Sequence, residues 1–453
     1  MTSTPSTEGF PQLPPGFLFG TSTASYQIEG AADEDGKGRS IWDTFAHTEG
    51  RIIDGSTGDV ACDHYHRVDE DVELMRGLGT HGYRFSLSWP RIQPTGSGAV
   101  NAAGLDFYDR LVDRLLEAGQ QPMATLYHWD LPQALEDDGG WLNRSTAEKF
   151  GEYADHVARR LGDRVTHWVP INEPNVVTML GYATGIHAPG KNLMFEALPV
   201  AHHLLLAHGL GAVAIRESGA TGEVGCANNH APMWPASDDP ADVGATKLFD
   251  ALWNGLFVEP MLLGRYPADL APLMEGMLRQ GDLAMIRQPL DFYGVNYYNP
   301  MKVAAAAEDS EMPFEQRDIL GYPTTDFGWP VVPEGLKELL ILMRARYRAA
   351  IPPILVTESG CSYGMGPDAD GVVDDQPRID YLDQHLRAVA LAIRQGVDVR
   401  GYYTWSLMDN FEWAEGFTQR FGLVHVDYDT LARTPKRSYD WYRDLIASQP
   451  AND

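Results

Sequence analysis

Two glutamates in this sequence stand just beyond apolar runs that are typical of buried strands. Glu173 follows residues 165–171 and the amide Asn172, and Glu358 follows residues 353–357. A carboxylate is costly to bury, so we expect each glutamate at the mouth of its strand rather than in the core. Two carboxylates at one mouth could flank a single bound atom, one as an attacking group and the other as a proton donor. Taken alone, either glutamate could instead form a structural ion pair with an arginine.

The elements that must position these groups alternate along nearly the whole chain. Short apolar runs predict strands, and amphipathic segments between them predict helices. Eight strands with helices between them, and no linker-like break, predict an α/β fold with a single (β/α)8 TIM barrel. The predicted strands are residues 17–24, 81–87, 121–127, 165–171, 223–227, 291–296, 353–357 and 399–404. The predicted helices are residues 68–78, 105–118, 146–161, 198–216, 334–347 and 379–395, with long loops at 28–60, 228–290 and 300–330.

One catalytic barrel domain is expected to span residues 17–453. Residues 1–16, which are rich in Ser, Thr and Pro, are predicted to form a disordered N-terminal tail. For the helix at 146–161 we expect Ser145 to be the N-cap, with Glu148 three residues later as in a capping box.

The predicted fold gathers polar and aromatic residues at one face, because the carboxyl ends of parallel barrel strands all open there. Buried polar groups need partners, so polar residues at all eight strand ends are hard to explain as structure alone. Amides and carboxylates can bind hydroxyl groups, while tryptophan rings can cover the C–H faces of a sugar. In strand order the residues are Gln27, Arg84, His128, Asn172 with Glu173, Asn228 with Asn229, Asn296 with Tyr298, Glu358, and Trp405 followed by Glu412 and Trp413.

The two glutamates define the chemistry expected at this face. In a retaining glycosidase two carboxyl groups stand about 5 to 5.5 Å apart. One attacks the anomeric carbon, and the other protonates the leaving oxygen and then deprotonates water. The attacking group must be ionised, and Arg84 and Tyr298 could hold it in that form. The proton donor needs a raised pKa, which burial and the charge of the other carboxylate would supply.

Seven short motifs occur in order along the chain. They are residues 27–30 (QIEG), 83–90 (YRFSLSWP), 128–132 (HWDLP), 172–174 (NEP), 296–298 (NYY), 357–360 (TESG) and the stretch 405–413, which contains DNFE. Together they resemble glycoside hydrolase family 1, the β-glucosidase family, from about residue 17 to residue 442. Each motif is short, but seven in the right order over nearly the whole chain make the match specific.

The resemblance implies a role for each position. Glu358 matches the nucleophile of the family and Glu173 its acid/base. Arg84 and Tyr298 match the pair that steadies the nucleophile. The positions that match the sugar pocket are Gln27, His128, Asn172, Glu412 and Trp413 around the hydroxyl groups, Trp405 under the ring, and Asn296 as a supporting residue.

Three positions depart from the family pattern. Pro170 stands where Thr is usual, Asn175 where many members have Trp, and Ser359 where Asn is usual. None of them removes a catalytic group. Asn175 leaves the preference for the aglycone, the leaving part of the substrate, open.

We therefore expect a retaining β-glycosidase, with a β-glucosidase as the first choice. It would hydrolyse terminal β-D-glucosyl residues of short oligosaccharides or of aryl and alkyl β-glucosides by double displacement, without a metal or organic cofactor. Glucose, galactose and fucose are left open as the preferred sugar, because one hydroxyl-binding set can serve C4 epimers.

Two alternatives remain. A 6-phospho-β-glycosidase is disfavoured by Glu412 and Trp413, because a carboxylate near O6 would repel a phosphate. A barrel that binds glycans without cleaving them would be expected to lack Glu173 or Glu358, and both are present.

Composition limits the partners. The chain has 35 basic and 63 acidic residues and a formal net charge of −28, which disfavours nucleic acid and anionic membranes. Its three widely spaced cysteines predict no disulfide framework, and the sequence 62–66 (CDHYH) does not have the spacing of a zinc site. We find no secretory signal and no apolar run as long as a membrane span, so the expected location is the cytoplasm. A homo-oligomer is left open.

Overall fold

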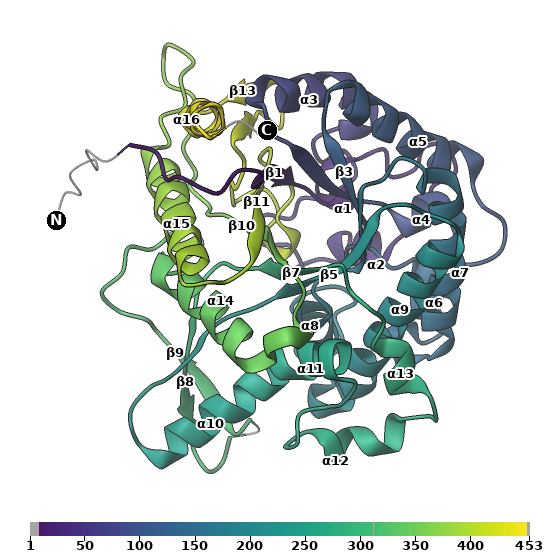
Figure 1. Ribbon diagram of the computed structural model, residues 1–453. Coiled ribbons are helices and arrows are strands. Elements are labelled where there is room, and N and C mark those ends of the chain that lie inside the picture. The colour runs from purple at the N-terminus through teal and green to yellow at the C-terminus, as the bar shows by residue number, and fades with distance from the viewer. Residues whose placement is uncertain (1–8, 311, 451–453) are drawn as a thin grey trace.

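Eight parallel strands close into a barrel, which confirms the predicted (β/α)8 fold (Figure 1). The computed structural model describes residues 9–310 and 312–450. Strand β1 pairs with β2 on one side and with β11 on the other, so the ring has no open edge. The barrel strands are β1 (Leu18–Ser22), β2 (Gly82–Ser86), β3 (Gln121–Tyr127), β4 (His167–Ile171), β5 (Glu223–Asn229), β7 (Phe292–Asn296), β10 (Ile354–Ser359) and β11 (Val399–Trp405).

Helices cover the outside of the barrel (Figure 1). Their apolar residues recur at helical spacing, as in α5, where Leu111 and Leu115 are buried and Leu116 is exposed. The main covering helices are α3 (His64–Leu78), α5 (Ala102–Glu117), α7 (Ser145–Leu161), α9 (Leu198–Glu217), α14 (Pro333–Tyr347), α15 (Gln376–Arg394) and α16 (Arg437–Ala447). Short elements at the loops are α1 (Ser25–Ile28), α4 (Trp89–Ile92), α6 (Gln133–Asp137), α8 (Pro174–Val176), β12 (Val424–Val426) and β13 (Arg433–Pro435).

The start of α7 differs from the sequence prediction. Ser145 makes no side-chain cap; its own N–H donates to the side-chain oxygen of Asn143 at 3.0 Å. Asn143 has the extended backbone of an N-cap, and asparagine caps helices as well as serine does. The predicted Ser145 cap is therefore wrong, and Asn143 takes that role.

The long segments predicted as loops contain regular structure. Their helices are short, and α11 is apolar at most positions and holds Pro260, so no helical period stands out in the sequence. Figure 1 shows α10 and a small sheet of β8 and β9 beside the barrel, where β6 pairs with β8. The elements are α2 (Ile41–Ala46), β6 (Met233–Pro235), α10 (Pro240–Asp250), a π-helical turn (Ala251–Gly255), α11 (Leu256–Leu263), α12 (Ala271–Met274), α13 (Asp282–Ile286), β8 (Met301–Ala305) and β9 (Phe314–Arg317).

The segment Met194–Glu217, which contains α9, is long and apolar enough to cross a membrane by length and composition. The expectation that no apolar run reaches that length is therefore wrong. However, 78 % of its most apolar stretch is buried inside the protein, and α9 packs against α7 and β4. Its apolar character is that of a core helix.

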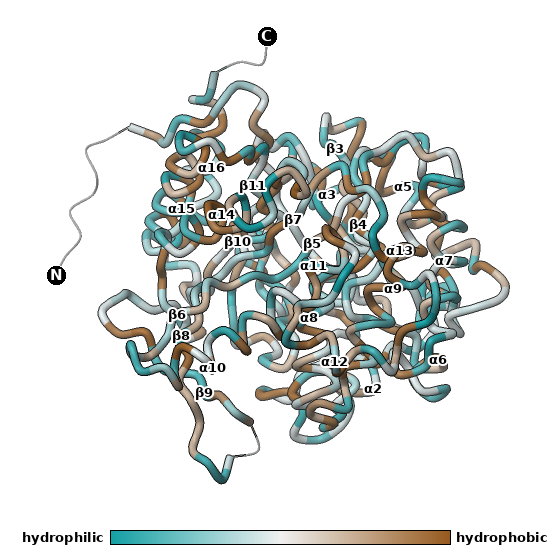
Figure 2. The backbone as a smooth tube through the Cα atoms, turned by 60° about the horizontal axis from the view of Figure 1, so that its bottom comes forward, coloured by the Kyte–Doolittle hydropathy of each residue, from teal (hydrophilic) through white to brown (hydrophobic). Residues whose placement is uncertain are grey.

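Residues 9–16 lie beside α16 in both ribbon and tube views (Figures 1 and 2). Leu13 is buried and its N–H donates to the side chain of Gln449 at 3.1 Å, while the ring of Phe10 meets Trp441 edge to face. This part of the predicted tail is packed on the barrel; residues 1–8 lie outside the described residues.

Apolar side chains fill the barrel interior below the mouth. One buried cluster takes a single residue from each of six strands: Met123, Val169, Ala227, Phe292, Leu355 and Tyr403. Glu358 stands three residues beyond Leu355, and Asn172 three beyond Val169. These polar residues thus lie closer to the carboxyl ends of the strands than the apolar cluster does.

Candidate active site

Glu358 lies near the end of β10 and is only 2 % exposed. Its carboxylate is paired with Arg84 of β2 and accepts a hydrogen bond from the Tyr298 hydroxyl at 2.8 Å. Burial raises the pKa of Glu358, while Arg84 and Tyr298 stabilise the charged form and act in the opposite direction. Of the two glutamates, Glu358 is therefore the one whose neighbours stabilise the ionised carboxylate better.

Arg84 is held by three further contacts, one of which is from Nη1 to the Thr357 carbonyl at 3.3 Å. Its Nη2 donates to Oδ1 of Asn172 at 2.5 Å, and its Nε donates to the Thr125 hydroxyl at 3.1 Å. The guanidinium is thereby fixed between strands β2, β3 and β10 and the end of β4. A cation fixed in this way can favour negative charge on Glu358 without reorganising.

Glu173 occupies a sharp turn between β4 and α8. Its φ is +45°, in the left-handed region that is uncommon for residues with a side chain, and Pro174 follows as the first residue of α8. The Glu173 N–H donates to the Ala227 carbonyl of β5 at 2.8 Å, which holds the turn against the barrel. The side chain is therefore set at the mouth and not in the strand.

The hydrogen-bond partners of the Glu173 carboxyl group are neutral amides. Oε1 accepts from Nδ2 of Asn296 at 2.8 Å and from Nδ2 of Asn229 at 3.2 Å. Burial, followed by the negative charge of Glu358, raises the pKa of Glu173 to about 8. This group can therefore hold a proton at neutral pH, whereas the Arg84 cation favours the ionised form of Glu358.

Asn172 links Arg84 to His128 through hydrogen bonds. Its Oδ1 accepts from Arg84 and from Asn296, so its Nδ2 faces Nε2 of His128, at 3.0 Å. Burial lowers the pKa of His128 well below its usual range, so the ring is neutral, and Nε2 must be the acceptor. Nδ1 then carries the proton, and it has no partner among the described residues. This buried donor is available to a ligand hydroxyl.

Gln27 and Glu412 form a second polar pair at the mouth. Nε2 of Gln27 donates to Oε2 of Glu412 at 3.2 Å and to the Phe411 carbonyl at 2.9 Å. Oε1 of Gln27 is buried without a partner within the described part of the chain. Burial, followed by the charge of Glu358, raises the pKa of Glu412 to about 8. Both side chains can bind hydroxyl groups.

A cavity of about 1010 Å³ opens at this mouth. Trp405 and Trp413 both face His128, with ring centroids 5.9 and 5.8 Å away, so aromatic surface lies beside the polar groups. The predicted site residues that line the cavity are His128, Glu173, Tyr298, Glu358, Trp405, Glu412 and Trp413. The remaining ones, Gln27, Arg84, Asn172 and Asn296, lie behind the wall, and each bonds to a lining residue.

The outer part of the cavity is reached by solvent and carries exposed apolar side chains beside charged ones such as Lys302 and Arg317. Its lining there includes Ile53, Ile186 and Leu320, which are 69 %, 56 % and 84 % exposed. Trp329 stacks on Phe327 at 4.2 Å in the same wall. A ligand with its polar end among the glutamates would place its other end against this apolar wall.

The structure adds two residues to the predicted set. Asn229 stood among the predicted strand ends but received no role, and it proves to bond to Glu173. Trp253 also lines the cavity and donates to Asn229 at 3.2 Å. Trp253 lies in the segment 228–290, which sequence spacing could not connect with the barrel mouth. Across residues 9–310 and 312–450, no group of three or more metal-binding side chains is placed to hold a metal ion.

The arrangement matches known proteins. The family model described as Glycosyl hydrolase family 1 matches residues 10–450. Beta-glucosidase A of Acetivibrio thermocellus is 46 % identical over 442 residues, which cover 96 % of this chain and 98 % of that protein.

Solved structures agree. The psychrophilic β-glucosidase BglU from Micrococcus antarcticus superimposes with a TM-score of 0.93 at 46 % identity, covering 96 % of this chain and 98 % of that one. Virulence factor SghA from Agrobacterium tumefaciens has a TM-score of 0.93 at 46 % identity, with 95 % and 97 % covered, and has also been solved with its substrate analog salicin. With the family match over nearly its whole length, this chain is a glycoside hydrolase that belongs to glycosyl hydrolase family 1, among the β-glucosidases of that family.

Proposed function

We propose that this enzyme is a retaining β-glucosidase that hydrolyses terminal β-D-glucosyl residues of short oligosaccharides or of aryl and alkyl β-glucosides by a two-glutamate double displacement. The observation that carries the proposal is the contrast between two glutamates at one cavity. Glu358 is paired with a cation, whereas Glu173 is surrounded by neutral amides and has a pKa of about 8. Two carboxyl groups with separated pKa values are what acid and nucleophile roles require.

In the first step, a carboxylate oxygen of Glu358 attacks the anomeric carbon. The bond from that carbon to the leaving oxygen breaks, and the proton held by Glu173 moves to the leaving oxygen. A glycosyl ester of Glu358 forms, and Glu173 becomes a carboxylate.

In the second step, Glu173 takes a proton from water, and the water oxygen attacks the same carbon. The ester bond breaks, Glu358 is restored as a carboxylate and the sugar leaves with its β configuration retained. The loss of charge on Glu358 in the ester lowers the pKa of Glu173, because that charge is one of the causes that raise it. One residue can therefore serve as acid and then as base.

A 6-phosphorylated substrate fits this cavity less well than a plain glucoside. The inner end of the cavity holds Glu412, and the basic residues among its lining, Lys302 and Arg317, belong to β8 and β9 of the small outer sheet. A phosphate beside Glu412 would meet like charge when that group is ionised.

The three cysteines are free and buried, which supports a reducing compartment, and we propose the cytoplasm.

The replacement Glu358→Gly tests the assignment. We expect loss of hydrolysis of 4-nitrophenyl β-D-glucoside by at least about 10⁴-fold, because no covalent intermediate can form. Wild-type turnover in this variant would remove Glu358 as the nucleophile.

Proton NMR of the first product from wild-type enzyme tests retention separately. We expect β-glucose first, and α-glucose appearing first would contradict double displacement. A folded wild-type enzyme that binds glucosides but cleaves none would favour a glycan-binding barrel, and faster hydrolysis of a 6-phosphoglucoside than of the plain glucoside would favour a phospho-glycosidase.

A further inference from the structure

The orientation of the Asn229 side chain is fixed by Trp253. An indole N–H can only donate, so the Asn229 atom that receives it, 3.2 Å away, must be Oδ1. The other end of the amide, Nδ2, then points to Oε1 of Glu173. Without such a donor, the amide could turn over and present an acceptor to Glu173 instead.

Asn296 is fixed in the same way from the opposite side. Its Nδ2 donates to Oδ1 of Asn172 at 3.2 Å, an atom that the donor-only Arg84 fixes as an acceptor, and the same Nδ2 faces Oε1 of Glu173. The Thr357 hydroxyl then donates to Oδ1 of Asn296 at 2.7 Å. Asn229 and Asn296 are direct partners in the register of β5 and β7, which brings both amides to the same oxygen. Among the described residues, no hydrogen bond is made by Oε2 of Glu173. The two oxygens of this carboxyl group are thus unequal.

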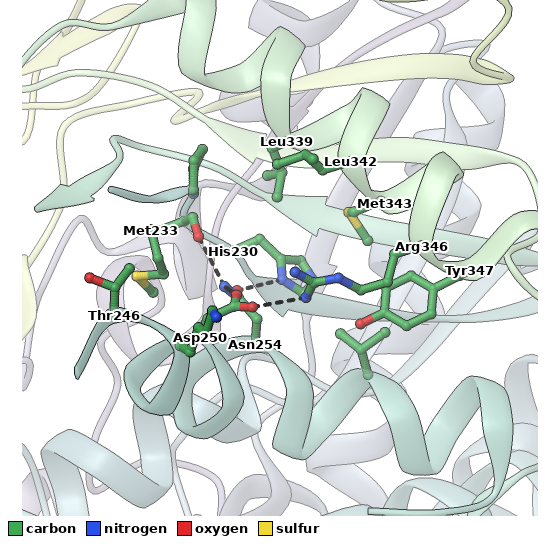
Figure 3. A pocket seen from close by; sticks show the side chains of 14 residues that line it. His230, Met233, Thr246, Asp250, Asn254, Leu339, Leu342, Met343, Arg346 and Tyr347 are labelled. Carbon is green, nitrogen blue, oxygen red and sulfur yellow. Dashed lines mark hydrogen bonds and ion pairs between the residues drawn. The ribbon is translucent and has the colours of Figure 1, made fainter. Parts of the chain in front are cut away.

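The segment that carries Trp253 is anchored on its outer side (Figure 3). Trp253 lies in the π-helical turn Ala251–Gly255. In the next residue, Asn254, Oδ1 accepts from Nδ1 of His230 at 2.9 Å and Nδ2 donates to the Ala231 carbonyl at 2.9 Å. Asp250 pairs with Arg346 of α14 at 2.9 Å, across a small cavity of about 220 Å³. π-helical turns occur frequently at functional sites.

The backbone of Asn229 is held as well. Nδ2 of Asn175 donates to the Asn229 carbonyl at 3.0 Å, and Asn175 is buried. Asn175 is the residue that stands where many family members have Trp. Both ends of Asn229 are therefore restrained, the backbone by Asn175 and the amide by Trp253.

We propose that Trp253 is a positioning residue that acts through Asn229: it keeps the Asn229 amide donating to Oε1 of Glu173, so that Oε2 carries the proton given to the leaving oxygen. The inference rests on the proposed role of Glu173 as acid/base. Donation to Oε1 favours the ionised form of Glu173 and so opposes the rise of its pKa.

The test is the pH dependence of kcat/KM for Trp253→Phe, Asn229→Ala and the double variant. The substrate is an aryl glucoside whose phenol is a poor leaving group. Each single variant should move the alkaline limb upward by about 0.5 to 1 pH unit, because one donor to the Glu173 carboxylate is lost or turned away. In the Asn229→Ala background, Trp253→Phe should add no further shift, because its effect passes through the amide.

Two controls separate this role from packing. Trp234→Phe makes the same change where the indole N–H donates to Glu338 at 3.1 Å, outside the cavity lining, and should leave the profile unchanged. Trp329→Phe reduces the aromatic wall of the cavity and should change KM without moving the alkaline limb. An unmoved limb in Trp253→Phe, or an equal shift in the Asn229→Ala background, would overturn the proposal.

The same assay on Glu173→Ala distinguishes this inference from the proposed function. If Glu173→Ala retains wild-type hydrolysis of a poor leaving group, the acid/base assignment itself fails. If Glu173→Ala is impaired and the limb of folded Trp253→Phe does not move, only the positioning role of Trp253 fails. Thermal unfolding of each variant shows that the protein measured is folded.

Discussion

The two sides of the cavity at the barrel mouth hold the same kind of residue in opposite ways. On the side of β2 and β10, Glu358 meets the Arg84 cation, and the contacts that fix this pair come from barrel strands and the residue that follows β4. On the side of β4 and β5, Glu173 meets two neutral amides, and one of them depends on Trp253 from a segment outside the barrel. The residue type does not decide the role of either glutamate; its surroundings do.

The difference also separates what the barrel provides from what its insertions provide. Charge compensation of Glu358 uses elements that any closed barrel of this topology would bring together. The hydrogen bonds of Glu173 reach, through Asn229, to Trp253 in the π-helical turn at residues 251–255, and the neighbouring Asn254 bonds to His230, which follows β5. We infer that the side of the cavity that holds Glu173 is where this chain can be tuned without disturbing the barrel.

The largest effect that sharpens this comparison is expected from Glu173→Ala. Hydrolysis of a glucoside with a poor leaving group should fall by about 10² to 10⁴-fold, because the leaving oxygen is no longer protonated. A substrate with a good leaving group should lose less in the first step. Azide should accelerate turnover of the latter and yield β-glucosyl azide, since it needs no base to attack the ester. An equal loss for both substrates would place Glu173 outside proton transfer.

A smaller effect is expected from Arg84→Lys. Lysine keeps the charge but cannot bond to Glu358, Asn172 and Thr125 at once, so kcat/KM should fall by about 10- to 100-fold. The pKa of Glu358 should rise, and the acidic limb of the pH profile should move upward. Measured pH profiles of kcat/KM test both expectations.

The matched control for this prediction is Arg91→Lys. Arg91 is equally buried and pairs with Glu29 at 2.9 Å, away from the cavity lining. The Arg91→Lys substitution should lower the melting temperature while kcat/KM stays near the wild-type value. Similar catalytic losses in the two variants would mean that Arg84 acts through stability alone.

The sequence predicts the Glu358 side of the site better than the Glu173 side. Arg84 lies within a predicted strand and Glu358 directly follows one, so topology alone brings them to one face. Asn229 could be placed at a strand end but not paired with Glu173, because hydrogen bonds between side chains leave no periodic pattern. Trp253 could not be placed, since its segment has short helices without a clear period.

The prediction of smallest size concerns the coupling between the two sides. Glu358→Gln removes the charge that is the second cause of the raised pKa of Glu173, and burial is the first. The pKa of Glu173, which is about 8 in the wild-type enzyme, should therefore be about one unit lower in the variant. It should remain above its ordinary value because the burial is unchanged. Carbon-13 NMR of labelled Glu173 carboxyl groups during a pH titration measures this directly.

The sign of that shift decides how the glutamates are linked. A lower pKa in Glu358→Gln means that forming the ester on Glu358, which also removes its charge, converts Glu173 from an acid into a base at constant pH. An unchanged pKa would mean that burial and the amides of Asn229 and Asn296 set it alone. In that case the pKa of Glu173 would be independent of the charge on Glu358. The change of Glu173 from acid to base between the two proposed steps would then need another cause.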